Sequence, residues 1–167
     1  DYLGITHDYS TPGQVKLTME RIVETLMNEC GVAGHAVTPA TDHLFNVRPT
    51  AVKLDKDQAE WFHRQVMRVM YLAKRARPDC LTTVAFQSTR VTKSDVDDSG
   101  KLVRLLKYLG ATRERGVVLN IGSKGIVVTQ LVDAAYGVHE DGKSHTGSVV
   151  MIGDGAVVQA KSSKHRG

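Results

Sequence analysis

The chain has few cysteines, few aromatic residues and no long apolar run. Its two cysteines, Cys30 and Cys80, are too isolated for a disulfide framework and are typical of a reducing compartment. No run approaches the roughly 20 apolar residues that span a bilayer, and the N-terminus has neither the basic start nor the apolar stretch of a secretory signal. Aromatic residues make up only 5% of the chain, so no base-stacking platform is evident. These absences predict a soluble, intracellular protein with no membrane partner.

The remaining composition is that of a folded domain with a basic balance. Of the 167 residues, 41% are hydrophobic and 24% charged, which is ordinary for a globular protein and argues against disorder of the bulk. The formal charge of +4 permits a polyanionic partner without requiring one. Basic residues gather in segments 63–79, 104–115 and 161–167. Each segment fits either a surface that tracks phosphates or a plain solvated helix face.

The first 31 residues are predicted to form a hairpin followed by a helix. The Pro-Gly pair at 12–13 predicts a turn at Thr11–Gln14 between two short strands. Thr18 fits a helix N-cap, and Gly31 fits the stop after the last helical turn. Between them, apolar residues recur with the spacing of one helix face: Met19, Ile22, Val23, Leu26, Met27 and Cys30.

A second helix is predicted after a long connection. Residues 31–54 mix Gly, Pro and Thr with few periodic apolar positions, so we expect an extended segment there. Asp55 and Gln58 resemble a capping box, and Pro78 interrupts the helical pattern after a basic end that suits the helix dipole. The apolar face of this helix is formed by Ala59, Phe62, Val66, Val69, Met70 and Ala73.

Two further helices and a set of strands follow. A third helix is predicted from Asp79 to about Thr89. Ser94 and Asp97 form a start signal for a fourth helix, which Gly110 would end. From residue 117 the apolar period changes to that of strands: "VVLNI", a "GSKG" turn, "IVVTQLVDA", a polar loop, "TGSVVMI", a "GDG" turn and "AVVQAKS". The shift near residue 115 is the best candidate domain boundary.

Several charged clusters invite a metal interpretation. The segment "DVDDSG" at 95–100 resembles a paired-aspartate site, but its acids fall in the first turn of a predicted helix, where the macrodipole favours negative charge. The residues Cys30, His35, His43 and Cys80 lack the close pairs that zinc sites use. His139 and His145 flank a loop without a paired acid or nucleophile at useful spacing, so we interpret them as loop residues.

Asp133 is the one carboxylate inside a strand-like apolar run. Val128, Leu131 and Val132 place it at the end of a strand, and small residues follow it at once. A carboxylate held on a rigid strand next to a hairpin suits Mg²⁺-dependent phosphodiester chemistry. A turn aspartate is the alternative, and the spacing alone leaves both open.

The segment "VDAAYGVHEDGKSHTGSVVMIGDGAVVQAKSSK" resembles the start of the ribonuclease H domain of copia-type LTR retrotransposon polyproteins, in which a strand-borne Asp, a D-x-K-S-x-T-G segment and an S-K-K or S-S-K segment recur. "YLAKRARPDCLTTVAFQSTRV" and "LVRLLKYLGATRERGVVL" resemble the same family's R-P-D helix pair and its R-x-L-R-Y-L-x-G-T helix with the next strand. "YLGITHDYSTPGQVKLT" resembles the L-G hairpin of its reverse transcriptase, near the primer terminus. The resemblance covers nearly the whole chain in the family's order.

The resemblance implies an α+β fold in two parts. Residues 1–115 would be a mostly helical thumb and connection region of a reverse transcriptase, and residues 116–167 the N-terminal part of a ribonuclease H-like domain with its first three antiparallel strands. Asp133 would be the first catalytic, metal-binding carboxylate, with Mg²⁺ as the cofactor. Leu3 and Gly4 would form the primer-contacting hairpin. Nucleic-acid backbone contacts would come from the basic residues Arg64, Arg68, Lys74, Arg75 and Lys107.

The expected chemistry is two-metal hydrolysis of the RNA strand of an RNA–DNA hybrid, with ions about 3.5–4 Å apart. The chain starts after the family's polymerase aspartates and stops before its next catalytic Glu, so we expect a fragment that is inactive alone, with an uncovered apolar sheet face and an open edge. Its partners would be an RNA–DNA hybrid or template–primer and the rest of the polyprotein, in a cytoplasmic virus-like particle or the nucleus. The alternatives are a non-catalytic basic nucleic-acid-binding module and a transposon remnant without a role.

Overall fold

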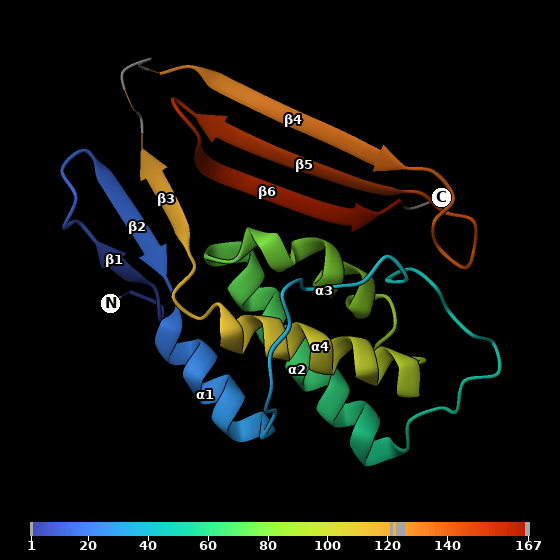
Figure 1. Ribbon diagram of the computed structural model, residues 1–167. Helices are drawn as coiled ribbons and strands as arrows, with labels where there is room; N and C mark the ends of the chain where they lie inside the picture. Colours follow the sequence, from blue (N-terminus) through green and yellow to red (C-terminus); the bar gives the residue numbers. More distant parts are fainter. Residues whose placement is uncertain (1, 121, 123–125, 166–167) are drawn as a thin grey trace.

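The chain begins with a small sheet that joins its N-terminus to its middle. The computed structural model describes residues 2–120, 122 and 126–165 (Figure 1). Strands β1 (Thr6–Asp8) and β2 (Gln14–Thr18) form the predicted hairpin, closed by the Gln14 N–H donating to the carbonyl oxygen of Thr11 at 3.3 Å. Strand β3 (Val117–Asn120) pairs antiparallel with the other side of β2, which gives the sheet order β1-β2-β3.

Helix α1 (Glu20–Cys30) starts one residue later than the sequence predicts. Its N-cap is Met19, and no side chain caps it. The prediction of Thr18 as the cap is wrong because Thr18 is the last residue of β2, paired with Thr6 in the hairpin. The predicted stop is confirmed: Gly31 has φ 59° and donates its N–H to the carbonyl oxygen of Met27 at 3.0 Å.

Helix α2 (Lys56–Arg75) has the predicted capping box. The Asp55 carboxylate accepts from the Gln58 N–H at 2.9 Å, and the Gln58 side chain accepts from the Asp55 N–H at 3.3 Å. Residues 31–54 before it contain no helix or regular strand, as predicted. After it, the short 3₁₀ turn η1 (Pro78–Cys80) leads into α3 (Leu81–Ser88), because Pro78 supplies a fixed φ at the start of a helical turn.

Helix α4 (Val96–Ala111) is capped by Asp95 and not by Ser94. The Asp95 carboxylate accepts from the backbone N–H groups of Asp97 and Asp98, both at 3.1 Å, and Asp98 completes the capping box. The prediction of a Ser94–Asp97 start is therefore one residue early. Gly110, the predicted stop, lies inside the last turn.

The hydrophobic core lies among the four helices of the described residues (Figure 1). Each fully buried Val, Leu or Phe side chain of this core stabilises the fold by about 1.5–3 kcal/mol. No helix among the residues described is long and apolar enough to cross a membrane. The fully buried members include Val23 and Leu26 of α1, Phe62, Val66, Val69 and Leu72 of α2, Val84 of α3, and Leu102, Leu105, Leu106 and Leu109 of α4.

The second sheet contains β4 (Val128–Ala135), β5 (His145–Ile152) and β6 (Ala156–Lys164), antiparallel in the order β4-β5-β6. Strand β6 lies nearest α3 and β4 is the outer edge (Figure 1). Every residue of β4 is exposed, including Leu131 and Val132. The open edge and exposed apolar surface expected of these strands are thus present, while most of the predicted "GSKG" turn lies outside the described residues. Helices and antiparallel sheets together confirm the α+β class.

Candidate nucleic-acid and metal site

Asp133 lies on the face of the second sheet that looks toward the helices. It is directly opposite Gly147 of β5, which is opposite Ser162 of β6. Residues directly opposite in antiparallel strands share a face. Ser162 Oγ is 3.4 Å from Thr82 Oγ1 of α3, and Ala160, two residues earlier in β6, packs against the helical core. Asp133 therefore points inward, although its strand is too far out for α3 to cover it.

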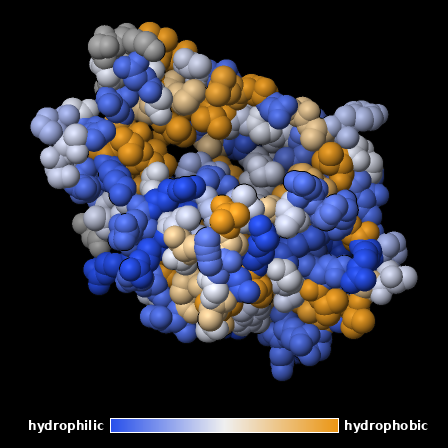
Figure 2. Space-filling model, viewed as in Figure 1, coloured by the Kyte–Doolittle hydropathy of each residue, from blue (hydrophilic) through white to orange (hydrophobic). Residues whose placement is uncertain are grey.

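A hollow of about 250 Å³ separates this face from the start of α3. In the view of Figure 2, the surface is hollowed between the sheet and the helices, and apolar residues gather over the sheet. Among the described residues, the hydrogen bond that the Asp133 carboxylate accepts is a local one, from the Ala134 N–H at 2.8 Å. Besides Asp133, the residues that line the hollow include Leu81, Thr82, Leu131, Gly147, Val149, Ser162 and the basic Lys161.

The described residues fit one bound divalent ion better than two. Asp133 is an exposed, hard oxygen ligand, and Mg²⁺ in proteins is often held by one or two carboxylates plus waters and substrate phosphates. In residues 2–120, 122 and 126–165, no group of three or more His, Cys, Asp or Glu is placed to hold a metal ion. A two-metal site would need carboxylates that this part of the chain does not bring to Asp133.

Two histidines that the sequence pattern places in a loop form a buried pair. His139 Nε2 lies 3.0 Å from His145 Nδ1, and His145 Nε2 lies 2.6 Å from Ser162 Oγ. Each histidine is 5% exposed, and the rings of Phe45 and Phe86 pack against them. Only His139 is in the loop; His145 opens β5, so the loop interpretation is wrong for it. Counting by twos from Gly147 along β5 places His145 on the inward face, which is a pattern that the sequence contains.

Burial sets the protonation of this pair. It lowers the pKa of His139 below its usual range, and the positive charge of Lys164 lowers it further. Burial likewise lowers the pKa of His145, with a smaller contribution from His165. Both imidazoles are therefore neutral at pH 7, so that each ring has one donor and one acceptor nitrogen for the chain that ends at Ser162.

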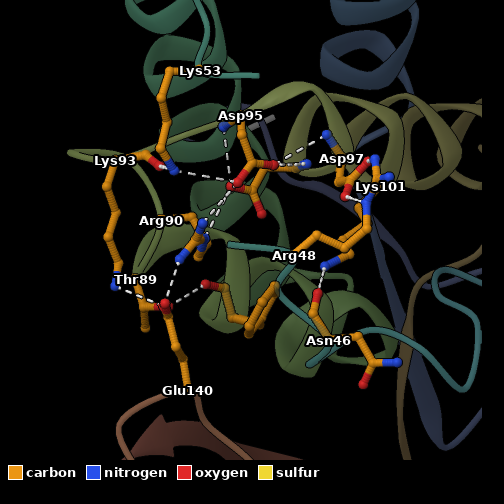
Figure 3. Close-up of polar contacts among 12 residues, drawn as sticks. Asn46, Arg48, Lys53, Thr89, Arg90, Lys93, Asp95, Asp97, Lys101 and Glu140 are labelled. Carbon is orange, nitrogen blue, oxygen red and sulfur yellow. Dashed lines mark hydrogen bonds and ion pairs between the residues drawn. The ribbon is translucent and has the colours of Figure 1, made fainter. Parts of the chain in front are cut away.

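A buried arginine ties the β4–β5 loop to the start of α4 (Figure 3). Arg90 donates from Nη2 to Asp95 Oδ2 at 3.0 Å, from Nε to Asp98 Oδ2 at 2.9 Å and from Nη1 to Glu140 Oε2 at 3.2 Å. Lys93 donates to the same Glu140 oxygen at 3.0 Å. Asp95 and Asp98 of "DVDDSG" thus form a capping box and bind Arg90, while Asp97 pairs with Arg48. This agrees with the prediction that these acids lie at the start of a helix.

The charges of this cluster are mutually dependent. Burial opposes the charge of Arg90, but its hydrogen bond to Asp98 and the negative charges of Asp98, Asp95 and Glu140 outweigh that effect and raise the pKa of Arg90. Burial raises the pKa of Asp98, and the hydrogen bond from Arg90 only partly offsets it. The close pairing of these charges therefore offsets the cost of removing them from water.

The predicted backbone-contacting residues are spread over two helices. Arg64, Arg68 and Arg75 lie on one side of α2 by their spacing, but Arg68 is paired with Glu29 at 2.5 Å. The Arg75 guanidinium lies 3.7 Å from the centre of the Tyr71 ring. Lys74 is exposed on another side of α2, while Lys107 belongs to α4 and lies beside Gly34. The structure does not gather these five residues into one row.

Leu3 and Gly4 form the tip of a tight turn ahead of β1. Their φ angles are 53° and 76°, and Tyr2 and Ile5 exchange backbone hydrogen bonds of 3.1 and 2.9 Å across them. Leucine in the left-handed region costs roughly 1–2 kcal/mol, which the surrounding contacts must offset. One such contact is the Tyr71 hydroxyl, which donates to the Leu3 carbonyl oxygen at 2.8 Å and fixes the turn to α2. The Leu3 side chain itself stays exposed.

The fold and site together define an α+β protein whose second sheet carries an inward-facing carboxylate beside a hollow. Comparison of the chain with protein-family models, with curated proteins and with solved structures finds no match. Any assignment of function therefore rests on the sequence motifs and on the geometry of this site.

Proposed function

We propose that this chain is part of a copia-type retrotransposon reverse transcriptase and ribonuclease H polyprotein, and that it contacts an RNA–DNA hybrid or template–primer. The observation that carries the proposal is the position of Asp133: it lies on a regular strand, faces a hollow and, among the described residues, accepts a hydrogen bond from the backbone N–H of Ala134 and forms no ion pair. A carboxylate placed in this way is available to a metal ion and its ligand. The L-G turn, at Leu3 and Gly4, would lie near the primer.

In this proposal Asp133 holds Mg²⁺ together with a substrate phosphate. The ion would supply charge stabilisation for phosphodiester hydrolysis. Complete cleavage activity would depend on further carboxylates, supplied by other parts of the polyprotein, since the described residues place none beside Asp133. The complex would act inside the cell, in a cytoplasmic particle or the nucleus.

A second candidate function is a non-catalytic nucleic-acid-binding module. It is favoured by the same lack of a second carboxylate among the described residues, and by the exposed cations Arg64 and Lys74 on α2. Phosphate contacts of this kind give affinity that falls steeply with salt and does not depend on Mg²⁺.

One binding and cleavage experiment separates the two. A fluorescein-labelled RNA–DNA hybrid is titrated with the chain over a salt series, with and without Mg²⁺, and the hybrid is then analysed for cleavage. Mg²⁺-dependent binding or cleavage that Asp133→Asn abolishes supports the metal site, with the exposed loop carboxylate Asp42→Asn as the control. Salt-sensitive binding that Asp133→Asn leaves unchanged supports the module. No affinity for the hybrid at modest salt contradicts both.

A further inference from the structure

The hydrogen-bonded chain of His139, His145 and Ser162 ends at a hydroxyl group that lines the hollow. Ser162 Oγ lies 2.6 Å from His145 Nε2, and His145 Nδ1 lies 3.0 Å from His139 Nε2. A serine nucleophile needs a base within about 2.6–3.2 Å and a third group that orients the base. The three residues have this order and this spacing.

The distance between Ser162 and His145 indicates which of the two donates. Hydrogen bonds from N–H to oxygen are about 2.7–3.2 Å long, and those that hydroxyl groups donate are about 2.5–3.0 Å long. At 2.6 Å the contact fits a hydroxyl donor, so the Ser162 O–H points at His145 Nε2. His145 then carries its hydrogen on Nδ1 and donates it to His139 Nε2. A serine proton can pass to an imidazole in this direction.

Burial keeps the base of this chain free to accept a proton. Both histidines are 5% exposed, and burial lowers the pKa of each. The other titratable groups that face the pair are Lys164, Asp141 and His165, and Lys164 is itself paired with Asp141 at 2.7 Å. The lone pair of His145 Nε2 is therefore available at pH 7.

Two hydrogen-bond donors flank Ser162 and can receive the oxygen of a reacting carbonyl group. Thr82 Oγ1 of α3 is 3.4 Å from Ser162 Oγ. The second donor follows from the ladder: the His165 N–H donates to the Ser144 carbonyl oxygen at 2.9 Å, and hydrogen-bonded pairs alternate along antiparallel strands. Ser162, opposite Gly147, is thus in a pair without such bonds, so its N–H points away from β5. Hydroxyl and backbone N–H groups both stabilise an oxyanion.

The lining of the hollow suits a small, uncharged substrate. Its volume of about 250 Å³ is below the roughly 300–1,000 Å³ of sites for drug-sized ligands. Leu81, Leu131 and Val149 form apolar walls, and Asp133 and Lys161 add one charge of each sign. A neutral acyl group can bury its apolar surface against these walls without adding a charge.

The group that orients the base limits the chemistry. His139 is neutral, so it fixes the tautomer of His145 but stabilises the imidazolium that forms less than a carboxylate would. A base of this kind favours substrates with a good leaving group. Carboxylic esters meet this condition better than amides do.

We propose that this chain hydrolyses small, uncharged carboxylic esters, with Ser162 as the nucleophile, His145 as the base and His139 as the residue that positions His145. Ser162 Oγ bonds to the acyl carbon and its proton passes to His145 Nε2, which gives it to the leaving alcohol as the ester C–O bond breaks. Water then attacks the acyl carbon and gives a proton to His145, which returns it to Ser162 Oγ as the acid leaves. This activity goes beyond the proposed function, because it uses neither nucleic acid nor a metal ion.

The test follows the cleavage of para-nitrophenyl butyrate by the whole chain in the presence of EDTA. Ser162→Ala removes the nucleophile, and Ser163→Ala makes the same change on the next residue of β6, whose side chain is on the opposite face. His139→Phe removes the nitrogen that orients His145, and His139→Gln keeps an acceptor near its position. Circular dichroism checks the fold, and mass spectrometry of the intact and the digested chain locates the acyl group.

We expect Ser162→Ala to lower kcat/KM by about 100-fold or more, while Ser163→Ala cleaves the ester as the unmodified chain does. His139→Phe should lower kcat by about 10-fold or more with little change in KM, and His139→Gln should retain most of the kcat. The acyl group should be found on Ser162 and be absent from Ser162→Ala.

Several results would overturn the proposal. The chain has seven histidines, which cleave activated esters slowly by themselves, so a rate no higher than that of free imidazole at the same histidine concentration is one of them. An unchanged rate in Ser162→Ala, an equal loss in Ser163→Ala, or an acyl group on another residue are the others. An unchanged kcat in His139→Phe overturns the positioning role of His139.

If His139→Phe does not fold, Ser162→Ala and the location of the acyl group decide the question. The hybrid titration described above is a separate measurement, so this inference and the proposed function can fail independently of each other.

Discussion

Replacement of Arg90 by methionine should destabilise the protein far more than the loss of an exposed arginine. The Arg90 side chain is 3% exposed, and the side chains of its partners Asp95 and Asp98 are 2% and 1% exposed. Methionine keeps the length of the side chain but leaves two buried carboxylates without their cation. Lys53 lies 3.5 Å from Asp95, yet its exposed side chain serves only that acid.

The expected loss is about 3–5 kcal/mol, the usual cost of breaking a buried ion pair by removing one partner. Stabilities of single domains are about 5–15 kcal/mol, so this loss is a large share of the total. For a chain of this size it corresponds to a fall in Tm of roughly 6–20 °C. The β4–β5 loop should also loosen, because Glu140 loses one of its two cationic partners.

The exposed pair Arg48–Asp97 provides a matched control. Arg48 makes two hydrogen bonds of 2.6 Å to Asp97, shorter than any that Arg90 makes, but its side chain is 66% exposed. Exposed pairs contribute about 0–1 kcal/mol, so Arg48→Met should cost little. Urea unfolding followed by circular dichroism measures both variants. Equal losses for Arg48→Met and Arg90→Met, or a loss below about 1 kcal/mol for Arg90→Met, would refute the argument that burial decides the contribution.

Two other predictions concern the histidine pair and the glycines. The fold lowers the pKa values of His139 and His145 and therefore favours their neutral forms. The stability that these neutral histidines contribute is complete above about pH 6.5, and it is lost as the pH falls through the lower pKa values of the folded state. Urea unfolding should show that the free energy of unfolding falls between about pH 7 and pH 5, and His139→Phe should make this fall smaller. A free energy of unfolding that does not change over this pH range would contradict the lowered histidine pKa values. A Cβ on Gly116 would lie 2.1 Å from the Leu17 carbonyl oxygen, so Gly116→Ala should cost at least about 1–3 kcal/mol. Gly110→Ala, which meets only the flexible Met27 side chain at 3.0 Å, should be tolerated or gain up to about 1 kcal/mol from helix propensity, and equal effects of the two changes would count against the clash.

The elements that could be predicted from the sequence are those with local determinants. The capping box of α2 depends on Asp55 and Gln58 alone, and the stop of α1 depends on Gly31, so short-range patterns sufficed. The sequence predicts the start of α4 one residue too early because Ser94 and Asp95 both suit the N-cap position. Arg90 donates to both acids of the capping box, Asp95 and Asp98, and this contact favours Asp95 as the cap. No local sequence pattern contains it.

The parts that could not be predicted depend on contacts between distant segments. Strand β3 was recognisable, but its pairing with β2 was not, because edge pairing leaves no mark in either strand's own alternation. The histidine pair needs the return of the β4–β5 loop and the ring of Phe45, which comes from a connection without periodicity. The sequence places Asp133 on a strand, whereas the row that Asp133 shares with Gly147 and Ser162 depends on the register of β4, β5 and β6.

During synthesis of the chain, β2 is complete long before β3, its partner in the sheet, has been translated. Leu17 pairs with Val117, and 117 − 17 = 100 residues separate them in the chain. At roughly 5–20 residues per second, translation reaches β3 about 5–20 s after the hairpin of β1 and β2 has been synthesised. During that interval the outer edge of β2 is open to any extended segment nearby, in the same nascent chain or in that of a neighbouring ribosome. A polysome is therefore the setting in which this small sheet is most exposed to mispairing.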